Sequence, residues 1–342
     1  MMDDKRILLS SPHMSGQEIK NIQNAFNANW IAPVGPQIDE FENELSKLHK
    51  NKFVSVVNSG TAAIHLALNL IGIKQDDIVL CQSFTFIGSV NPVKYLKAEP
   101  VFIDSEIETW NICPEALETA ITKFIKKNKK PKAIIVVHLY GMPAKMDEII
   151  DLSKKYEIPI IEDAAESLGS KINDIPCGCF GDLGILSFNG NKIITTSGGG
   201  AILSSNKKMI EKARFFSTQS KDKAEHYQHS QVGFNYRLSN ISAAIGLGQL
   251  SVLNKRILSR RRNYDFYYSF LGSIEGITFL NEPKGFFSNR WLTTILINRE
   301  KFKDLDSRKI RLSLDAENIE SRPLWKPMHL QPVFKDCLYF GS

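Results

Sequence analysis

The chain has 342 residues, of which 43% are hydrophobic and 23% charged, and its formal net charge is +6. This composition excludes a disordered chain and is typical of a globular protein with one large and one smaller domain. No apolar run reaches the roughly 18 residues of a membrane span, and residues 1–14 lack the apolar core of a signal peptide, so we expect a cytoplasmic protein with no membrane partner. The basic run within residues 255–262 fits a solvated helix face better than a nucleic-acid surface, which would need a broader patch with interleaved aromatics.

The five cysteines do not form a recognisable pattern. They are odd in number and scattered, which argues against a disulfide framework. Cys177 and Cys179 have the wrong spacing for the usual zinc pairs and no nearby His or Cys partner in the sequence. We therefore expect buried or incidental thiols and no metal site.

The first 50 residues predict two helices joined by a loop of fixed conformation. Residues 16–27 and 37–49 have helical patterns, and the second is amphipathic. Between them, two prolines and a glycine surround Trp30 in residues 29–36, which is typical of a fixed loop and not of a linker. Trp30 could equally be a packing anchor between the two helices.

From residue 52 to about 205, short apolar strand candidates alternate with helical stretches. This alternation predicts an α/β fold with a mostly parallel central sheet flanked by helices. Ligands of such sheets collect at the carboxyl ends of the strands. The strand candidates are residues 53–57, 78–81, 100–103, 133–138, 158–162, 185–188 and 201–204.

The first strand is followed by a turn of small residues that opens a helix. Ser59, Gly60 and Thr61 precede the helical run 62–70. Such a turn presents free backbone N–H groups and the positive end of the helix dipole, which together suit a phosphate. An ordinary capped helix start is the commoner meaning of this pattern.

Two further strands also end in residues that could serve a site. Phe84 and Phe86 follow the second strand, where either could belong to the core. Asp163 follows an apolar strand that should be buried, so its carboxylate must be paired or used. A helix N-cap is an equally good explanation of Asp163.

A lysine lies in the glycine-rich loop after the strand candidate 185–188. Lys192 stands before a Thr-Thr-Ser-Gly-Gly-Gly turn. Alone, it would be interpreted as a solvated surface charge. Together with Asp163, the phosphate-type turn and a stackable aromatic, it indicates pyridoxal phosphate chemistry, which needs a lysine for its Schiff base, a carboxylate at the ring nitrogen and a phosphate cup.

Four motifs strengthen this interpretation, and their order resembles that of a known family. They are residues 58–63 (NSGTAA), 162–167 (EDAAES), 187–196 (SFNGNKIITT) and 233–240 (GFNYRLSN). The chain resembles, over nearly its whole length, the DegT/DnrJ/EryC1/StrS sugar-nucleotide aminotransferases. The resemblance implies the fold-type I architecture of pyridoxal phosphate-dependent transferases and an obligate homodimer with shared active sites.

The resemblance also implies roles for particular residues. Lys192 matches the Schiff-base lysine and Asp163 the partner of the ring nitrogen. Phe86 matches the aromatic stacked on the ring, and Glu166 falls near the ring hydroxyl, where many members carry Gln or His. The matches to phosphate contacts are Ser59, Gly60, Thr61 and Ser187, with Asn235 reaching across from the neighbouring subunit.

A narrower likeness concerns the substrate. Residues 11–14, 289–292 and 322–329 resemble UDP-N-acetylbacillosamine transaminases, which implies a UDP-linked 4-keto sugar as acceptor, L-glutamate as amino donor and transfer to C4. The expected sugar-nucleotide contacts are Asn29, Trp30, Ile31, Ala32, Arg322, Pro323, Leu324, Trp325 and His329. Packing is the alternative for both segments.

The sequence is also compatible with other substrates and with another class of protein. GDP-4-keto-6-deoxymannose is an alternative substrate, and a catalytically inactive, cofactor-binding regulator is an alternative class. Sugar 3-dehydratases of the same scaffold carry histidine in place of the lysine, so Lys192 argues against them. We expect a large cofactor-binding domain in residues 1–254 and a small domain in residues 255–342, shorter than is usual for the family.

Overall fold

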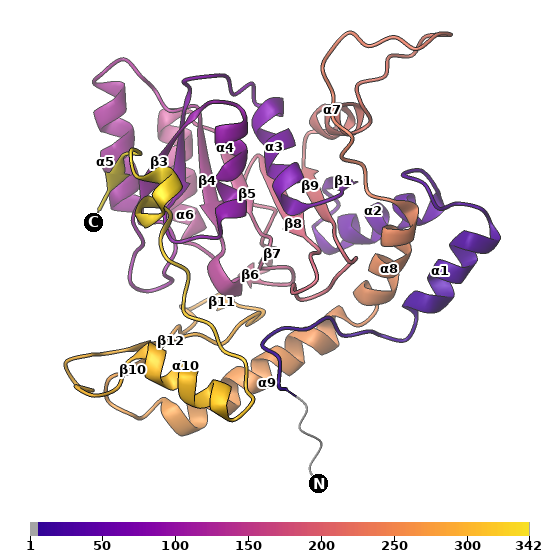
Figure 1. Cartoon of the computed structure of the whole chain (residues 1–342). Helices are drawn as coiled ribbons and strands as arrows, with labels where there is room; N and C mark the ends of the chain where they lie inside the picture. The colour runs from indigo at the N-terminus through magenta and orange to yellow at the C-terminus, as the bar shows by residue number, and fades with distance from the viewer. Residues whose placement is uncertain (1–5, 342) are drawn as a thin grey trace.

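A central sheet of eight strands organises the protein (Figure 1). The structure is a computed structural model and describes residues 6–341. The strand order is β1-β9-β8-β5-β4-β2-β3-β13. The strands span Phe53–Val57 (β1), Ile78–Gln82 (β2), Glu99–Ile103 (β3), Ala133–Val137 (β4), Ile160–Asp163 (β5), Leu183–Ser187 (β8), Gly200–Ser204 (β9) and Tyr339–Phe340 (β13).

Most of these strands are parallel, as the sequence predicts. Neighbouring strands from β8 through β5, β4, β2 and β3 to β13 pair in parallel, whereas β9 runs antiparallel to both β8 and β1. Every expected strand is present, with ends shifted by no more than two residues. The carboxyl ends of β2, β4, β5 and β8 therefore share one edge of the sheet.

Both faces of the sheet are covered by helices, which explains why its strands are apolar along their whole length. Successive side chains of a strand point to opposite faces. Val79 and Cys81 therefore join the core under α3, α4 and α7, while Ile78 and Leu80 join the core under α5 and α6. These helices span Gly60–Leu70 (α3), Asn91–Tyr95 (α4), Pro114–Ile125 (α5), Met146–Tyr156 (α6) and Lys207–Ser217 (α7).

Three more helices form a layer at the β1 end of the molecule (Figure 1). The two helices expected near the N-terminus are present as α1 (Glu18–Asn27) and α2 (Pro36–Leu48), and both pack on α8 (Asn240–Leu250). In the described residues, no helix has both the length and the apolar character needed to cross a membrane.

A smaller unit begins with α9, and strand pairing as well as the chain itself joins it to the large unit. It contains a two-stranded sheet, and a three-stranded sheet pairs its β11 with β6 of the large unit. After α10 the chain returns to the large sheet, where β13 pairs with β3 (Figure 1). The elements are α9 (Leu253–Leu271), β10 (Ile277–Phe279), β11 (Phe286–Phe287), β12 (Ile295–Ile297), α10 (Ser307–Ala316), β6 (Lys171–Ile172) and β7 (Ile175–Pro176), with short 3-10 helices at Ile87–Ser89, Leu139–Gly141, Met328–Leu330 and Pro332–Phe334. The division into domains at residue 255 stays a prediction. The returning segment, which comprises residues 317–341 after α10, ends against the large unit, where β13 pairs with β3.

Candidate active site

The loop between β8 and β9 places Lys192 inside the protein. Only 11% of its side chain is exposed, its Nζ lies 3.4 Å from Glu166 Oε1, and the centre of the Trp291 ring is 4.3 Å from Nζ. The carbonyl of Asn191 accepts hydrogen bonds from Trp291 Nε1 at 2.7 Å and from Ser10 Oγ at 2.7 Å. Lys192 is therefore a fixed, largely buried cation and not a solvated surface charge.

The carboxylate of Asp163 is fixed at the end of β5. The residue is 5% exposed, Oδ2 accepts a hydrogen bond from Ser89 Oγ at 2.7 Å, and Oδ1 accepts one from the Ala165 N–H at 3.1 Å. Residues 164–170 form turns and not a helix, so the N-cap alternative does not apply. An oriented, buried carboxylate of this kind suits a protonated ring nitrogen.

Glu166 faces Lys192 and is the most perturbed acid near it. Its Oε2 accepts the Tyr140 N–H at 2.7 Å, and Tyr140 adopts a left-handed φ of 53° that aims this amide. Burial raises the pKa of the Glu166 carboxyl to about 7, although the Lys192 ammonium and the Tyr140 amide act in the opposite direction. Glu166 can thus be either neutral or ionised near neutral pH.

The start of α3 is a turn of small residues that lies beside the end of β8. Ser59 caps the helix by accepting the Ala62 N–H at 3.0 Å. A Cβ on Gly60 would lie 3.0 Å from Ser187 Cβ, and one on Gly88 would lie 3.1 Å from Thr61 Oγ1. The structure therefore brings the four predicted phosphate residues together, with backbone N–H groups of the first helical turn at their centre.

Aromatic rings line the space between β2, β4 and the returning segment. Phe86 is 53% exposed, and its ring centre lies 5.5 Å from that of Trp325, which in turn lies 4.9 Å from Tyr140. The Tyr140 hydroxyl accepts the Trp325 N–H at 3.1 Å, and Leu324 packs against the same core. Phe86 keeps a large exposed ring surface for a ligand to stack on.

The remaining residues of the returning segment lie further along it. Arg322 is exposed and pairs with Glu320 at 2.6 Å, next to Pro323. His329 Nδ1 lies 2.7 Å from Ser83 Oγ, and its ring stacks on Tyr339 at 3.8 Å. His329 therefore ties the returning segment to the loop after β2.

The other predicted substrate segment lies at the α8 layer. The Asn240 side chain donates to the Trp30 carbonyl at 2.8 Å, and the Asn240 N–H donates to the Ala32 carbonyl at 2.9 Å. Asn29 is in the left-handed region, and Trp30 and Ile31 are 43% and 47% exposed. Within the described chain, no contact joins this segment to Lys192.

Asn235 lies near the carboxyl end of β1. Its carbonyl accepts a hydrogen bond from Asn58 Nδ2 at 3.4 Å, and its backbone bridges to Thr218. The residue is exposed, so its side chain is free to meet another surface.

The sequence does not single out Ser89 and Tyr140 near the site, and it singles out Trp291 only within residues 289–292, for their likeness to UDP-sugar transaminases. Ser89 and Tyr140 follow strands β2 and β4, so the strand-end rule that found Asp163 could have found them. Trp291 is 99 positions from Lys192 and belongs to the small unit, and no local pattern indicates that contact.

His138, whose role the sequence leaves unassigned, belongs to a buried structural cluster. Ligand atoms of His138, Glu162 and Cys177 lie within 4.8 Å of one another, which raises the question of a metal. Glu162 already accepts the Phe180 and Gly181 N–H groups at 2.8 and 2.9 Å and contacts His138 Nε2 at 2.8 Å, while His138 Nδ1 accepts the Ala144 N–H at 2.9 Å. The hydrogen bonds of His138 and Glu162 thus join β4 and β5 to the turn before β8.

The family model of the DegT/DnrJ/EryC1/StrS aminotransferase family matches residues 12–339. The chain belongs to this family. It is 51% identical over 337 residues to EpsN of Bacillus subtilis (strain 168), named as a pyridoxal phosphate-dependent aminotransferase, with 98% of this chain and 86% of that relative covered. A DegT DnrJ EryC1 StrS aminotransferase from Brucella abortus has a similar structure, with a TM-score of 0.87 and 30% identity over 95% of this chain and 85% of that chain.

Two further relatives are named for different sugar products. The GDP-perosamine synthase of Escherichia coli O157:H7 is 35% identical over 332 residues, with 97% of this chain and 88% of that relative covered. The UDP-4-amino-4,6-dideoxy-N-acetyl-beta-L-altrosamine transaminase of Campylobacter jejuni is 37% identical over 235 residues, with 68% and 61% covered. This member of the family is a pyridoxal phosphate-dependent sugar aminotransferase with the fold-type I architecture.

The side chains present fit pyridoxal phosphate. Lys192 offers an amine for the covalent link, and Asp163 offers an oriented carboxylate. A Cβ on Gly60 would lie 3.0 Å from Ser187 Cβ, so the glycine lets the first turn of α3, with its free backbone N–H groups, lie directly against Ser187, and such a turn suits a phosphate.

The raised pKa of Glu166 predicts a measurable pH dependence of stability. The unfolded carboxyl ionises near its ordinary value of 4.5, whereas the folded carboxyl stays protonated up to about 7, so the free energy of unfolding falls as pH rises through this window. In wild type, this group should lower the free energy of unfolding by on the order of 3 kcal/mol between pH 4.5 and 7.5. Glu166→Gln should not show this decrease, because its amide cannot ionise. Denaturant unfolding of the cofactor-free chain at both pH values measures this difference. The exposed control Glu211→Gln should behave like wild type, and equal pH dependence of wild type and Glu166→Gln would contradict the assignment.

Proposed function

We propose that this aminotransferase moves the amino group of L-glutamate to C4 of a UDP-linked 2-acetamido-4-keto-2,6-dideoxyhexose. The observation that carries the proposal is the buried Lys192 amine beside Glu166, together with the oriented carboxylate of Asp163 at the end of β5. The product would be a UDP-4-amino sugar for glycan synthesis. The likeness of residues 322–329 to UDP-sugar transaminases and the name of the Campylobacter jejuni relative support the UDP-linked acceptor.

Lys192 and its neighbours supply the proton chemistry. Pyridoxal phosphate, when bound, supplies an electron sink that weakens the Cα–H bond of the amino donor. Lys192 Nζ holds the cofactor at rest, and once freed it takes the Cα proton of glutamate and later returns a proton to C4 of the sugar. Asp163 stabilises the positive charge of a protonated ring nitrogen, and Phe86 provides a stacking surface.

The returning segment is the proposed recognition element for the sugar nucleotide. Its prolines restrict the loop, and its Trp, Arg, Lys and His side chains offer ring and diphosphate contacts. The second candidate, transfer to GDP-4-keto-6-deoxymannose, is favoured by the 35% identity to a GDP-perosamine synthase. The two substrates differ in the nucleotide and in the N-acetyl group.

Substrate preference separates these candidates. A pocket that hydrogen-bonds an N-acetyl group disfavours a sugar without it, because polar groups of the pocket would be left unpaired. We expect kcat/KM with glutamate as donor to be at least about tenfold higher for the UDP-linked acetamido sugar. An equal or reversed ratio would remove the UDP assignment and leave the aminotransferase standing. Trp325→Ala should weaken sugar turnover far more than the glutamate half-reaction, which serves as the internal control.

A homodimer with shared sites is the second part of the proposal. Asn235 is exposed on a segment that matches one reaching the neighbouring subunit's phosphate site, and closed two-fold symmetry is the commonest arrangement of such enzymes. Mixing Lys192→Ala with Asn235→Ala subunits should restore activity, because each heterodimer contains one site with both native residues. The control mixture pairs Lys192→Ala with the Lys192→Ala, Asn235→Ala double variant and should stay inactive. No recovery in the first mixture would contradict shared sites.

A further inference from the structure

We infer that Trp291 is a positioning residue for Lys192: its ring holds the protonated amine beside Glu166 while the amine carries the transferred proton. The inference rests on the proposed function, in which Lys192 alternates between amine and ammonium. It concerns a residue of the small unit that contacts the predicted catalytic lysine of the large unit.

The geometry is that of a desolvated cation–π pair. Lys192 Nζ lies 4.3 Å from the centre of the Trp291 ring, and Trp291 is only 2% exposed. Tryptophan is the best of the aromatic partners for a cation, and the attraction grows when water is excluded. On another side of the same ammonium, Glu166 Oε1 lies at 3.4 Å.

The two partners of the ammonium differ in one chemical respect. A carboxylate such as Glu166 can take a proton from Nζ, whereas the face of an indole ring has no basic site and cannot. Trp291 therefore favours the ammonium over the amine without competing for its proton. The ring thus stabilises the proton that Nζ takes from Cα against loss to Glu166, until Nζ delivers a proton to C4 of the sugar.

Hydrogen bonds hold the ring in this place. Trp291 Nε1 donates to the carbonyl of Asn191, the residue before Lys192, at 2.7 Å. The Trp291 backbone N–H donates to Asn289 Oδ1 at 2.9 Å, and Asn289 Nδ2 donates to the Glu166 carbonyl at 2.9 Å. One amide side chain thus joins the backbones of the two residues whose side chains contact the ammonium.

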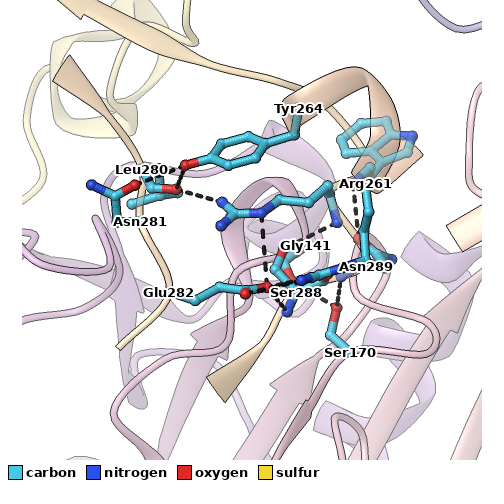
Figure 2. A network of polar contacts seen from close by, with 11 residues as sticks. Gly141, Ser170, Arg261, Tyr264, Leu280, Asn281, Glu282, Ser288 and Asn289 are labelled. Atoms are coloured by element: carbon cyan, nitrogen blue, oxygen red, sulfur yellow. Dashed lines mark hydrogen bonds and ion pairs between the residues drawn. The ribbon is translucent and has the colours of Figure 1, made fainter. Parts of the chain in front are cut away.

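Asn289 is itself anchored from both units (Figure 2). Its N–H donates to Ser170 Oγ at 2.8 Å, and that hydroxyl donates to the Gly141 carbonyl at 2.7 Å. On the other side, Arg261 of α9 donates to the Ser288 carbonyl at 2.6 Å and pairs with Glu282. The small unit therefore holds residues 288–291 against the large unit, which makes the position of Trp291 rigid.

The test measures the charge state of Lys192 directly in the full, cofactor-free chain. Trinitrobenzenesulfonate reacts only with the neutral amine, so the rate of modification of the Lys192 peptide against pH, followed by mass spectrometry, gives a midpoint and a high-pH plateau. In Trp291→Leu the midpoint should move to lower pH, with the rate below the midpoint increased about five-fold, the effect of losing about 1 kcal/mol of cation–π attraction. Trp291→Phe keeps an aromatic ring that attracts a cation less strongly, so its midpoint should lie between those of wild type and Trp291→Leu.

The high-pH plateau of the modification rate distinguishes a change in the charge of Lys192 from a change in its accessibility to the reagent. A substitution that merely opens the site raises the rate equally at every pH, whereas loss of the cation–π contact moves the midpoint. An unchanged midpoint in both variants, with or without a higher plateau, would overturn the inference. If Trp291→Leu does not fold, as judged by circular dichroism, Trp291→Phe alone decides the outcome.

Two controls keep the result specific. Trp325→Leu removes a neighbouring ring, 6.5 Å from that of Trp291, and should leave the midpoint unchanged. The exposed Lys207 should be modified alike in all variants. The proposed function is tested separately by where the cofactor attaches, so an unchanged midpoint with attachment at Lys192 removes only the role of Trp291.

Discussion

The parallel register of β4, β5 and β8 is the constraint on which the site depends. It aligns Val137, Asp163 and Ile185 across three neighbouring strands, so the segments that follow them start from one edge of the sheet. The first of these segments carries Tyr140, the second Glu166 and the third Lys192. A shift of register would separate these side chains. It would also move every strand side chain to the opposite helix-covered face, where its packing partners differ.

The two carboxyl groups at this edge of the sheet have different partners. Asp163 receives hydrogen bonds from Ser89 and Ala165 that stabilise a charge, whereas desolvation of Glu166 raises its pKa to about 7. Two acids three positions apart thus have different surroundings: Asp163 is held by two hydrogen bonds, and Glu166 titrates near neutral pH. The small unit contributes the third partner, Trp291, through the hydrogen bonds of Asn289.

Much of this arrangement could be predicted from the sequence, because the signals are local. Apolar runs of four to six residues mark the strands, and the rule that ligands collect at the carboxyl ends of strands points to Asp163 and the turn at Gly60 without any likeness to a family. A role for Lys192 could be predicted only in combination with Asp163 and the turn at Gly60, because one lysine in a loop indicates little by itself. The contact of Trp291 with Lys192 could not be predicted in this way, because it depends on long-range packing. Tyr140 follows β4, but its left-handed backbone, which aims its N–H at Glu166, has no local signal in the sequence. The segment around Trp30 lies at the α8 layer, and its predicted role requires a surface that a single chain does not supply.

The central claim is that Lys192 carries the cofactor, and borohydride reduction of the purified protein tests it most directly. The account predicts a yellow protein in which reduction fixes the cofactor to the peptide that contains Lys192. Lys192→Ala should keep its fold and lose this attachment, because the amine is both the anchor and the base. Attachment of the cofactor to any other lysine, or none to the wild-type chain, would contradict the account.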